Sequence, residues 1–342
     1  MRIVLDGMGG DHAPAEIVKG AVATVPDIDG RIMIVGDEKA INGILADYDY
    51  DKEKISVIHA DEVIDNHDSP VQAIRRKRGS SMVLGLEAVK NGEADMMISA
   101  GNSGALMTGS MLTLGRIQGI DRPALGSAYP IFGQGVSMLI DSGANAECKP
   151  HNLLHFAIMG SLYMEKVLGV HRPSIGLVNM GTEPGKGSKF LKETYELLEA
   201  KKHELRLNFV GNIEARDVPF GICDVYVCDG LVGNVVLKMT EGMALSVFGL
   251  IKRTITDGMR AKMGALVLSK RLGELRKEFD YTEYGGAPIL GVRGAVVKIH
   301  GSSNADAVRN GILKAIPYVD NKVVDTIEKS VTRITGIEAD EE

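Results

Sequence analysis

The stretch Ser174-Ile-Gly-Leu-Val-Asn-Met-Gly-Thr-Glu-Pro-Gly-Lys-Gly-Ser-Lys189 decides the fold class of this 342-residue chain. It begins with the apolar run Ile175–Val178, which is typical of a buried parallel strand. It leads into residues 190–198, where Phe, Leu and Tyr recur at helical spacing. Glycines between a strand and a helix place backbone N–H groups where they bind an anion. The alternative is a tight connection that needs glycine only for its geometry.

Within this loop the candidate ligands of an anion are Gly181, Thr182 and Lys186, and Lys189 adds a second cation. A lysine in a glycine loop at a helix start holds phosphate as a point charge. The loop matches neither the P-loop pattern nor the dinucleotide-binding glycine pattern. The anion interpretation therefore depends on the rest of the chain.

On both sides of this stretch, short apolar runs alternate with helical patterns along most of the sequence. This alternation predicts a parallel sheet with right-handed crossovers. We expect strands near residues 3–5, 31–35, 55–59, 95–99, 126–131, 136–140, 205–210, 223–228, 289–292 and 295–299. We expect one α/β domain over residues 1–335, a helical segment for dimer or membrane contact at about 240–280, and a disordered acidic tail at 336–342.

Five of the expected strands end in glycine beside a polar residue, namely Asp6, Asn102, Asn179, Asn212 and Asp229. Ligands of open α/β sheets bind outside the carboxyl ends of the strands. We therefore predict one polar cleft in which a single anion site gathers Asn102, Ser103, Asn179, Thr182, Lys186, Asn212, Asp229 and Asn234.

Each of the other polar motifs has two interpretations, one structural and one functional. Asp6, Asp11 and His12 lie in one loop and are either metal ligands or turn and helix caps, of which we favour caps. His151 and His155 lie four residues apart on an expected helix, but no further zinc ligand accompanies them, so a structural role is favoured. The run Arg75–Arg78 is a solvated helix end or a docking patch for an acidic partner.

Composition narrows the class of protein. Hydrophobic residues make up 44% and charged residues 25%, which is ordinary for a globular protein. The net charge is −6 and aromatics are only 5%, which argues against nucleic-acid binding. Cys148, Cys223 and Cys228 match no common zinc spacing, so we expect free thiols in a reducing compartment. No secretory signal or transmembrane run is evident, and we expect a cytosolic protein.

The segment Met259–Phe279 carries an apolar stripe at helical spacing, with Met259, Met263 and Leu266 on the opposite face and a basic rim. A buried interface helix is one interpretation. Peripheral contact with an anionic membrane is the other interpretation. Both can hold, with one face of the helix against a partner subunit and the other against lipid.

In combination the motifs become specific. They are, in order, Asp6-Gly-Met-Gly-Gly-Asp-His-Ala-Pro14, Gly101-Asn-Ser-Gly-Ala105, Asp141-Ser-Gly-Ala-Asn145, Asn179-Met-Gly-Thr-Glu183, Gly211-Asn-Ile-Glu214, Cys228-Asp-Gly-Leu-Val-Gly-Asn234 and Tyr284-Gly-Gly-Ala-Pro288. This set resembles the bacterial phosphate acyltransferase family PlsX of phospholipid synthesis, over about residues 1–335.

The resemblance implies transfer of a fatty acyl group from acyl-[acyl-carrier protein] to inorganic phosphate, without a cofactor or metal. It implies a three-layer α/β/α fold with a mostly parallel central sheet, similar to isocitrate and isopropylmalate dehydrogenases and to phosphotransacetylase. It also implies a cytoplasmic homodimer with peripheral membrane contact. With the strand-end pattern, we assign catalysis to Asn179, Lys186 and Asn234, and phosphate or substrate binding to Gly9, Gly10, His12, Gly101, Asn102, Ser103, Gly104, Gly181, Thr182, Asn212, Asp229 and Gly233.

The chemistry is consistent with such a site. Phosphate is already anionic, so attack on a thioester needs positioning and oxyanion stabilisation rather than a catalytic triad. Two alternatives remain open, a nicotinamide-dependent dehydrogenase of related fold and a non-catalytic acyl-lipid or regulatory binding module. The dehydrogenase lacks its glycine fingerprint. Turnover of an acyl-carrier thioester that depends on phosphate separates all three.

Overall fold

The computed structural model describes residues 1–131, 135–256 and 285–335, and a few single positions between 258 and 275. These residues form an 11-stranded sheet of order β3-β2-β1-β4-β11-β10-β5-β6-β9-β7-β8. The strands are β1 (Arg2–Asp6), β2 (Arg31–Gly36), β3 (Ile55–His59), β4 (Met96–Ser99), β5 (Ala124–Pro130), β6 (Val136–Ile140), β7 (Ser174–Asn179), β8 (Asn208–Glu214), β9 (Val225–Val227), β10 (Ala287–Leu290) and β11 (Ala295–Lys298).

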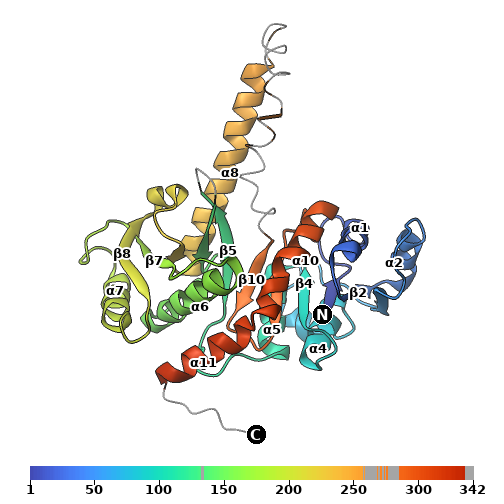
Figure 1. The fold of residues 1–342 in the computed structure, drawn as a ribbon, viewed down its shortest axis with the longest axis horizontal. Helices are drawn as coiled ribbons and strands as arrows, with labels where there is room; N and C mark the ends of the chain where they lie inside the picture. Colours follow the sequence, from blue (N-terminus) through green and yellow to red (C-terminus); the bar gives the residue numbers. More distant parts are fainter. Residues whose placement is uncertain are drawn as a thin grey trace.

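Helices cover both faces of the sheet, so the fold has three layers (Figure 1). One face packs against α1 (Ala15–Thr24), α2 (Glu38–Leu45), α6 (Pro150–Leu168), α7 (Lys189–Lys201), α10 (Ala305–Asp320) and α11 (Val323–Thr335). The other packs against α3 (Pro70–Arg76), α4 (Ser81–Lys90), α5 (Ser103–Thr113) and the start of α8 (Gly230–Ile255). Two short 3₁₀ helices, η1 (Val25–Asp27) and η2 (Ala215–Phe220), complete the described elements.

The strands are apolar because the sheet is covered twice. In β1, Ile3 and Leu5 join one core cluster while Val4 joins the other, as the period of two along a strand requires. The expected α/β class with a mostly parallel sheet is confirmed. Several boundaries differ by one to three residues, and the largest error is the strand expected at 205–210, which runs from Asn208 to Glu214. Residues 203–207 still turn after α7, where the Leu207 N–H donates to the Lys202 carbonyl at 2.8 Å.

Parallel strands form two groups that run in opposite directions. One group is β3-β2-β1-β4-β11 and the other is β6-β9-β7-β8. The strands β10 and β5 lie between them, and each pair among β11, β10, β5 and β6 is antiparallel. The two groups therefore direct their carboxyl ends toward the centre of the sheet from opposite sides.

The helix α8 projects from the body of the protein (Figure 1). Only Gly230 and Gly233 of this helix are buried in the chain described here. By length and composition alone, Gly230–Thr256 would be able to cross a membrane. The expected contact segment Met259–Phe279 lies largely outside the described residues, as does the tail at 336–342; Leu268 and Leu275 are described and are exposed.

Candidate active site

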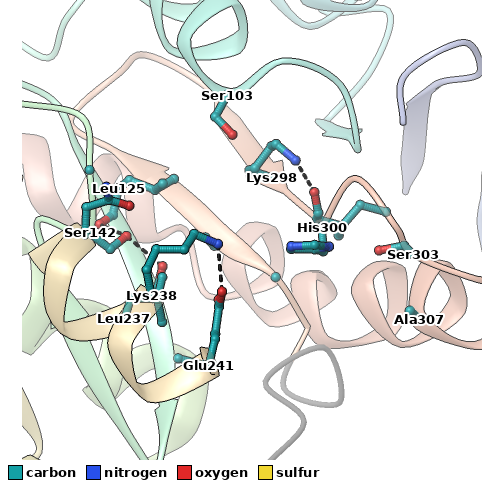
Figure 2. A pocket seen from close by; sticks show the side chains of 17 residues that line it. Ser103, Leu125, Ser142, Leu237, Lys238, Glu241, Lys298, His300, Ser303 and Ala307 are labelled. Atoms are coloured by element: carbon teal, nitrogen blue, oxygen red, sulfur yellow. Dashed lines mark hydrogen bonds and ion pairs between the residues drawn. The ribbon is translucent and has the colours of Figure 1, made fainter. Parts of the chain in front are cut away.

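A cavity of about 190 Å³ opens at the centre of the sheet, beside the amino-terminal half of α8 (Figure 2). Its walls come from β5, β10 and β11, from the loops after β6 and β11, from the starts of α5 and α10, and from residues 234–241 of α8. The lining residues are Ser103, Leu125, Ser127, Ala128, Ser142, Gly143, Asn234, Leu237, Lys238, Glu241, Gly286, Ala287, Lys298, Ile299, His300, Ser303 and Ala307.

Strand register explains why the cavity forms here. Lys298, the last residue of β11, pairs with Ala287 of β10. The antiparallel pairing of β10 with β5 brings Ser127 level with Ala287. Ser127 in turn pairs with Leu139, one residue before the end of β6. The carboxyl ends of β11 and β6 thus meet at one level, and ligands of α/β sheets bind outside such ends.

Two helices, α5 and α10, begin at this cavity, and α8 passes it with the side that carries Asn234, Lys238 and Glu241. Ser103 is the first residue of α5, Ser303 lies two residues before α10, and Asn234 lies at the end of the first turn of α8. A helix amino terminus carries free N–H groups and a partial positive charge. Each terminus is fixed by a side-chain cap, because Asn102, Asp229 and Asn304 accept hydrogen bonds from Ala105 N, Val232 N and Ala307 N. The amino termini of α5 and α10 at one cavity favour an anionic ligand.

Two basic groups enter the cavity from the β11–α10 junction (Figure 2). Lys298 is largely buried, and its Nζ donates to the carbonyls of Ala100, at 3.2 Å, and of Ile299. Burial lowers the pKa of Lys298 to about 8, so it is mostly charged at neutral pH. Burial also lowers the pKa of His300, and nearby Lys238 and Lys298 lower it further. The His300 ring contacts the Ser302 hydroxyl, with Nδ1 and Oγ 2.7 Å apart.

From the facing wall, α8 contributes an ion pair whose nitrogen and oxygen lie 2.7 Å apart, between Lys238 and Glu241. The other carboxylate oxygen of Glu241, Oε1, is buried and has no hydrogen-bond partner among the described residues. The same holds for the hydroxyl of Ser303, a residue that is 5% exposed. Buried polar atoms without partners are costly, so two of them on one cavity indicate a place for a polar ligand.

The loop after β6 is held by one carboxylate. Asp141 is fully buried, and its Oδ1 accepts hydrogen bonds from Leu125 N, Gly143 N and Ala144 N at 3.0–3.2 Å. Its Oδ2 accepts from the backbone and side-chain nitrogens of Asn145 at 2.7 and 2.8 Å. Burial raises the pKa of Asp141, while these hydrogen bonds lower it. The carboxylate thereby fixes the wall that carries Ser142 and Gly143.

Of the residues predicted from the sequence, Ser103 and Asn234 line the cavity. Asn102 and Asp229 do not line the cavity; they cap the helices α5 and α8, on which Ser103 and Asn234 lie. The predicted glycines allow close packing: a Cβ at Gly233 would lie 1.9 Å from the Asp141 carbonyl oxygen, and at Gly101 and Gly104 it would lie 2.9 Å from side-chain atoms of Met82 and Pro70.

The loop between β1 and α1 packs against the loop after β4, which leads to Ser103. Gly9 and Gly10 pack against the loop after β4, where a Cβ at Gly9 would lie 2.7 Å from Gly101 N. His12 is exposed. Asp6 is buried and accepts the hydroxyls of Ser81 and Ser99 at 2.6 and 2.7 Å, so it joins β1, α4 and β4. The described residues contain no group of three or more metal-ligating side chains.

The remaining predicted residues form a second cluster. Asn179 and Asn212 share a side-chain hydrogen bond of 3.2 Å and also bond the backbone carbonyls of Lys186 and Glu183. They thereby hold the loop in which Gly181 is buried and Thr182 and Lys186 are exposed. The Lys186 and Glu183 side chains lie 3.7 Å apart. Strand β7 is two strands from β6, so this cluster lies about 10 Å along the sheet from the Ser142 wall.

Several cavity residues were missed by sequence reasoning, namely Lys238, Glu241, Lys298, His300, Ser303, Ser127 and Ser142. Two of these residues, His300 and Ser303, lie in the junction His300–Asn304 between β11 and α10. Its signal was present, since it repeats the pattern of glycine and polar residues at a strand end. Lys238 and Glu241 carry no such signal, because an i, i+3 charge pair on a helix is ordinary on a solvated surface.

The cysteines do not supply a nucleophile to this cavity. Burial raises the pKa of Cys148 and of Cys223 to about 12, and it raises the pKa of Cys228 as well. Thiols in such surroundings are protonated and inert at neutral pH. None of the three lines the cavity.

The fold defines the class: it is the α/β/α fold of the phosphotransacetylases, and 94% of this chain aligns with 94% of the Streptococcus pyogenes phosphotransacetylase at a TM-score of 0.64 and 16% identity. The chain belongs to the family described as fatty acid synthesis protein, whose model matches residues 1–326. Among its relatives, the phosphate acyltransferase of Alkaliphilus oremlandii is 52% identical over 98% of both chains. That of Clostridioides difficile is 47% identical over 97% of both.

Proposed function

We propose that the chain transfers a fatty acyl group from acyl-[acyl-carrier protein] to inorganic phosphate and so supplies acyl phosphate for phospholipid synthesis. One observation carries the proposal: the cavity is lined by Lys238, Lys298 and His300 and by the starts of α5 and α10. Its relatives are named phosphate acyltransferases. The alternatives have no comparable support, since none of these features calls for a nicotinamide.

In the proposed reaction, Lys298 and the amino termini of α5 and α10 hold phosphate, and the Ser303 hydroxyl and the His300 ring complete its hydrogen bonds. A phosphate oxygen attacks the thioester carbonyl carbon. The new C–O bond forms, the C–S bond breaks, and sulfur leaves with the electron pair as a thiolate that takes a proton from water. The carbonyl oxygen gains charge in the transition state, and fixed N–H groups and Asn234 are suited to stabilise it.

The reaction is tested with purified protein, acyl-carrier thioester and phosphate. We expect release of free thiol and formation of acyl phosphate, trapped as the hydroxamate, only when phosphate is present. A change in nicotinamide absorbance would instead support the dehydrogenase, and absence of turnover with retained acyl-carrier binding would support a binding module.

We also propose that the chain works as a homodimer in the cytoplasm. The helix α8 leaves large apolar side chains in solvent, among them Met239, Met243 and Leu245, each at least 60% exposed. Patches of this kind mark interaction surfaces. A twofold dimer covers them most simply. Changing Met239 and Met243 to Glu should convert a dimer to a monomer in light scattering; an unchanged mass would exclude this face.

Peripheral membrane contact through Met259–Phe279 is proposed from sequence alone. Three apolar side chains, at roughly 1.5–3 kcal/mol each on burial, together with a basic rim support weak association with anionic lipid. Changing Met263 and Leu266 to Glu should abolish binding to anionic vesicles and leave the dimer and the soluble reaction intact. Dissociation of the dimer by the same change would assign that face to the interface.

A further inference from the structure

The chain carries an exposed basic surface at the C-terminal end of α3. Arg75, Arg76 and Arg78 are exposed, and none forms an ion pair with a described carboxylate. Their neighbour Lys77 differs, because its Nζ is 2.6 Å from Asp68 and also donates to the Val63 carbonyl. We call Arg75, Arg76 and Arg78 the arginine patch. In a chain of net charge −6, three unpaired guanidinium groups within four residues are a marked local reversal of sign.

The position of α3 relates the arginine patch to the cavity. Pro70, the first residue of α3, lies against Gly104, where a Cβ would be 2.9 Å from Pro70 Cγ. Ile74 lies in the same way against Gly109. The helix α3 therefore runs along α5 from its start, at which Ser103 lines the cavity. The Asn102 side chain also donates to the carbonyls of Asp65 and Asn66, which fixes the segment before α3 to the same loop.

Helix geometry gives the distance between Pro70 and Arg75 along α3. Five residues of α3 between Pro70 and Arg75 rise about 8 Å. The arginine patch thus lies at the far end of α3, about 8 Å beyond the residue that packs beside the start of α5, on a helix whose Ala73 and Ile74 are buried in the core. Arginine at a helix C-terminus also interacts favourably with the helix dipole, but this effect is confined to the last turn. The helix dipole therefore does not account for the presence of Arg78, which lies beyond the end of α3.

We infer that the arginine patch is the docking surface for the acidic protein that delivers the acyl thioester, an inference that rests on the proposed function. Opposite charge at an interface steers encounter and fixes register. Guanidinium groups bind carboxylates in two-pronged geometry and are preferred at interfaces. A partner seated on α3 delivers its acyl arm past the start of α5 into the cavity.

The chain offers a matched control surface. Arg172 and Arg206 are also exposed and without a described ion pair, and they lie with Lys202 and His203 around a surface hollow. This hollow adjoins the amino ends of β7 and β8, at the opposite edge of the sheet from Asn179 and Asn212. Charge reversal there changes the net charge of the protein without touching the proposed docking surface.

The test compares Arg75→Glu/Arg76→Glu/Arg78→Glu with Arg172→Glu/Arg206→Glu. For the first variant we expect at least a tenfold rise in the KM for acyl carrier protein, a kcat within twofold of wild type and an unchanged phosphate KM. The wild-type KM should rise with salt, and this dependence should largely vanish in the variant. The control should keep the wild-type KM. Arg75→Gln/Arg76→Gln/Arg78→Gln gives the same direction with a smaller charge change if the Glu variant folds poorly.

Calorimetric titration with unacylated acyl carrier protein measures docking apart from catalysis. Weaker binding by the arginine-patch variant alone supports the inference, even where turnover is absent. Equal binding by wild type and variant overturns it. An equal loss in the control variant also overturns it, because the effect is then one of net charge. Loss of binding to anionic vesicles with an unchanged carrier KM would assign the surface to a membrane instead. Wild-type turnover of acyl carrier with phosphate tests the proposed function separately.

Discussion

The hydroxyl oxygens of Ser127 and Ser142 lie 2.6 Å apart in the wall of the cavity. Ser127 is on β5 and Ser142 is in the loop after β6, so this contact ties the loop to the strand that joins the two halves of the sheet. Ser142 Oγ also donates to the Leu125 carbonyl at 3.0 Å. The cavity wall is therefore fixed by side chains as well as by strand pairing.

Ser142→Ala should destabilise the protein by about 1–3 kcal/mol, because it leaves the buried Ser127 hydroxyl without this partner. We also expect lower kcat/KM, since the wall beside Asn234 is loosened. Urea unfolding and steady-state kinetics measure the two effects. Thr326→Ala serves as the control, as this hydroxyl on α11 donates to the Lys322 carbonyl, away from the cavity; equal effects in both variants would contradict the assigned role.

Lys298 should govern the pH dependence of phosphate binding. Its pKa is lowered to about 8, so the ammonium is present below that pH and is lost above it. The phosphate KM should therefore rise as pH increases from 7 to 9. Lys298→Met should raise the KM at least tenfold at pH 7, while Lys298→Arg, which keeps its charge, should flatten the rise. A wild-type KM that is constant over this range would exclude the assignment.

Lys186 was predicted from the sequence as the phosphate-holding cation. The assignment from sequence predicts that Lys186→Ala raises the phosphate KM, whereas the assignment to Lys298 predicts an unchanged KM. Either way the free energy of unfolding should change little, because the Lys186 side chain is exposed and its pairing with Glu183 is loose. Measuring the phosphate KM for Lys186→Ala beside Lys298→Met ranks the two loops. An unchanged KM in Lys186→Ala would leave only a structural role for the loop 179–188.

The fold was predictable because its signals are local. A buried strand or an amphipathic helix is visible within ten residues, and alternation of the two implies the layered architecture. Ser103 and Asn234 were predictable for the same reason, since each follows a glycine-rich strand end. Lys298 and His300 became site residues through the antiparallel strands β10 and β5, whose register joins residues more than 150 positions apart. No short-range pattern reveals that pairing.

Asp141→Asn should be strongly destabilising, although it changes little in volume. The carboxylate accepts five hydrogen bonds from nitrogen donors, and an amide NH₂ in place of one oxygen would face donors instead of accepting from them. We expect a loss of about 2–4 kcal/mol in urea unfolding, together with a large loss of kcat. Asp121→Asn, at a half-exposed carboxylate, should cost much less. Equal costs would show that burial of Asp141 does not set its contribution.

His155 should make the protein sensitive to moderate acid. It is 7% exposed in α6, its Nδ1 has no partner among the described residues, and burial lowers its pKa to about 4. The unfolded chain binds a proton near the ordinary pKa of about 6.5, whereas the folded protein does not until about 4. Stability is therefore lost as pH falls from 6.5 to 4, by roughly 3 kcal/mol in total. His155→Leu should remove this loss from denaturant midpoints measured across the range, while His203→Leu, at an exposed position, should retain it. The quantity to compare is the slope of the denaturant midpoint with pH, because the stability at neutral pH also reflects the change in side-chain volume. An unaltered slope in His155→Leu would assign the acid sensitivity to another group.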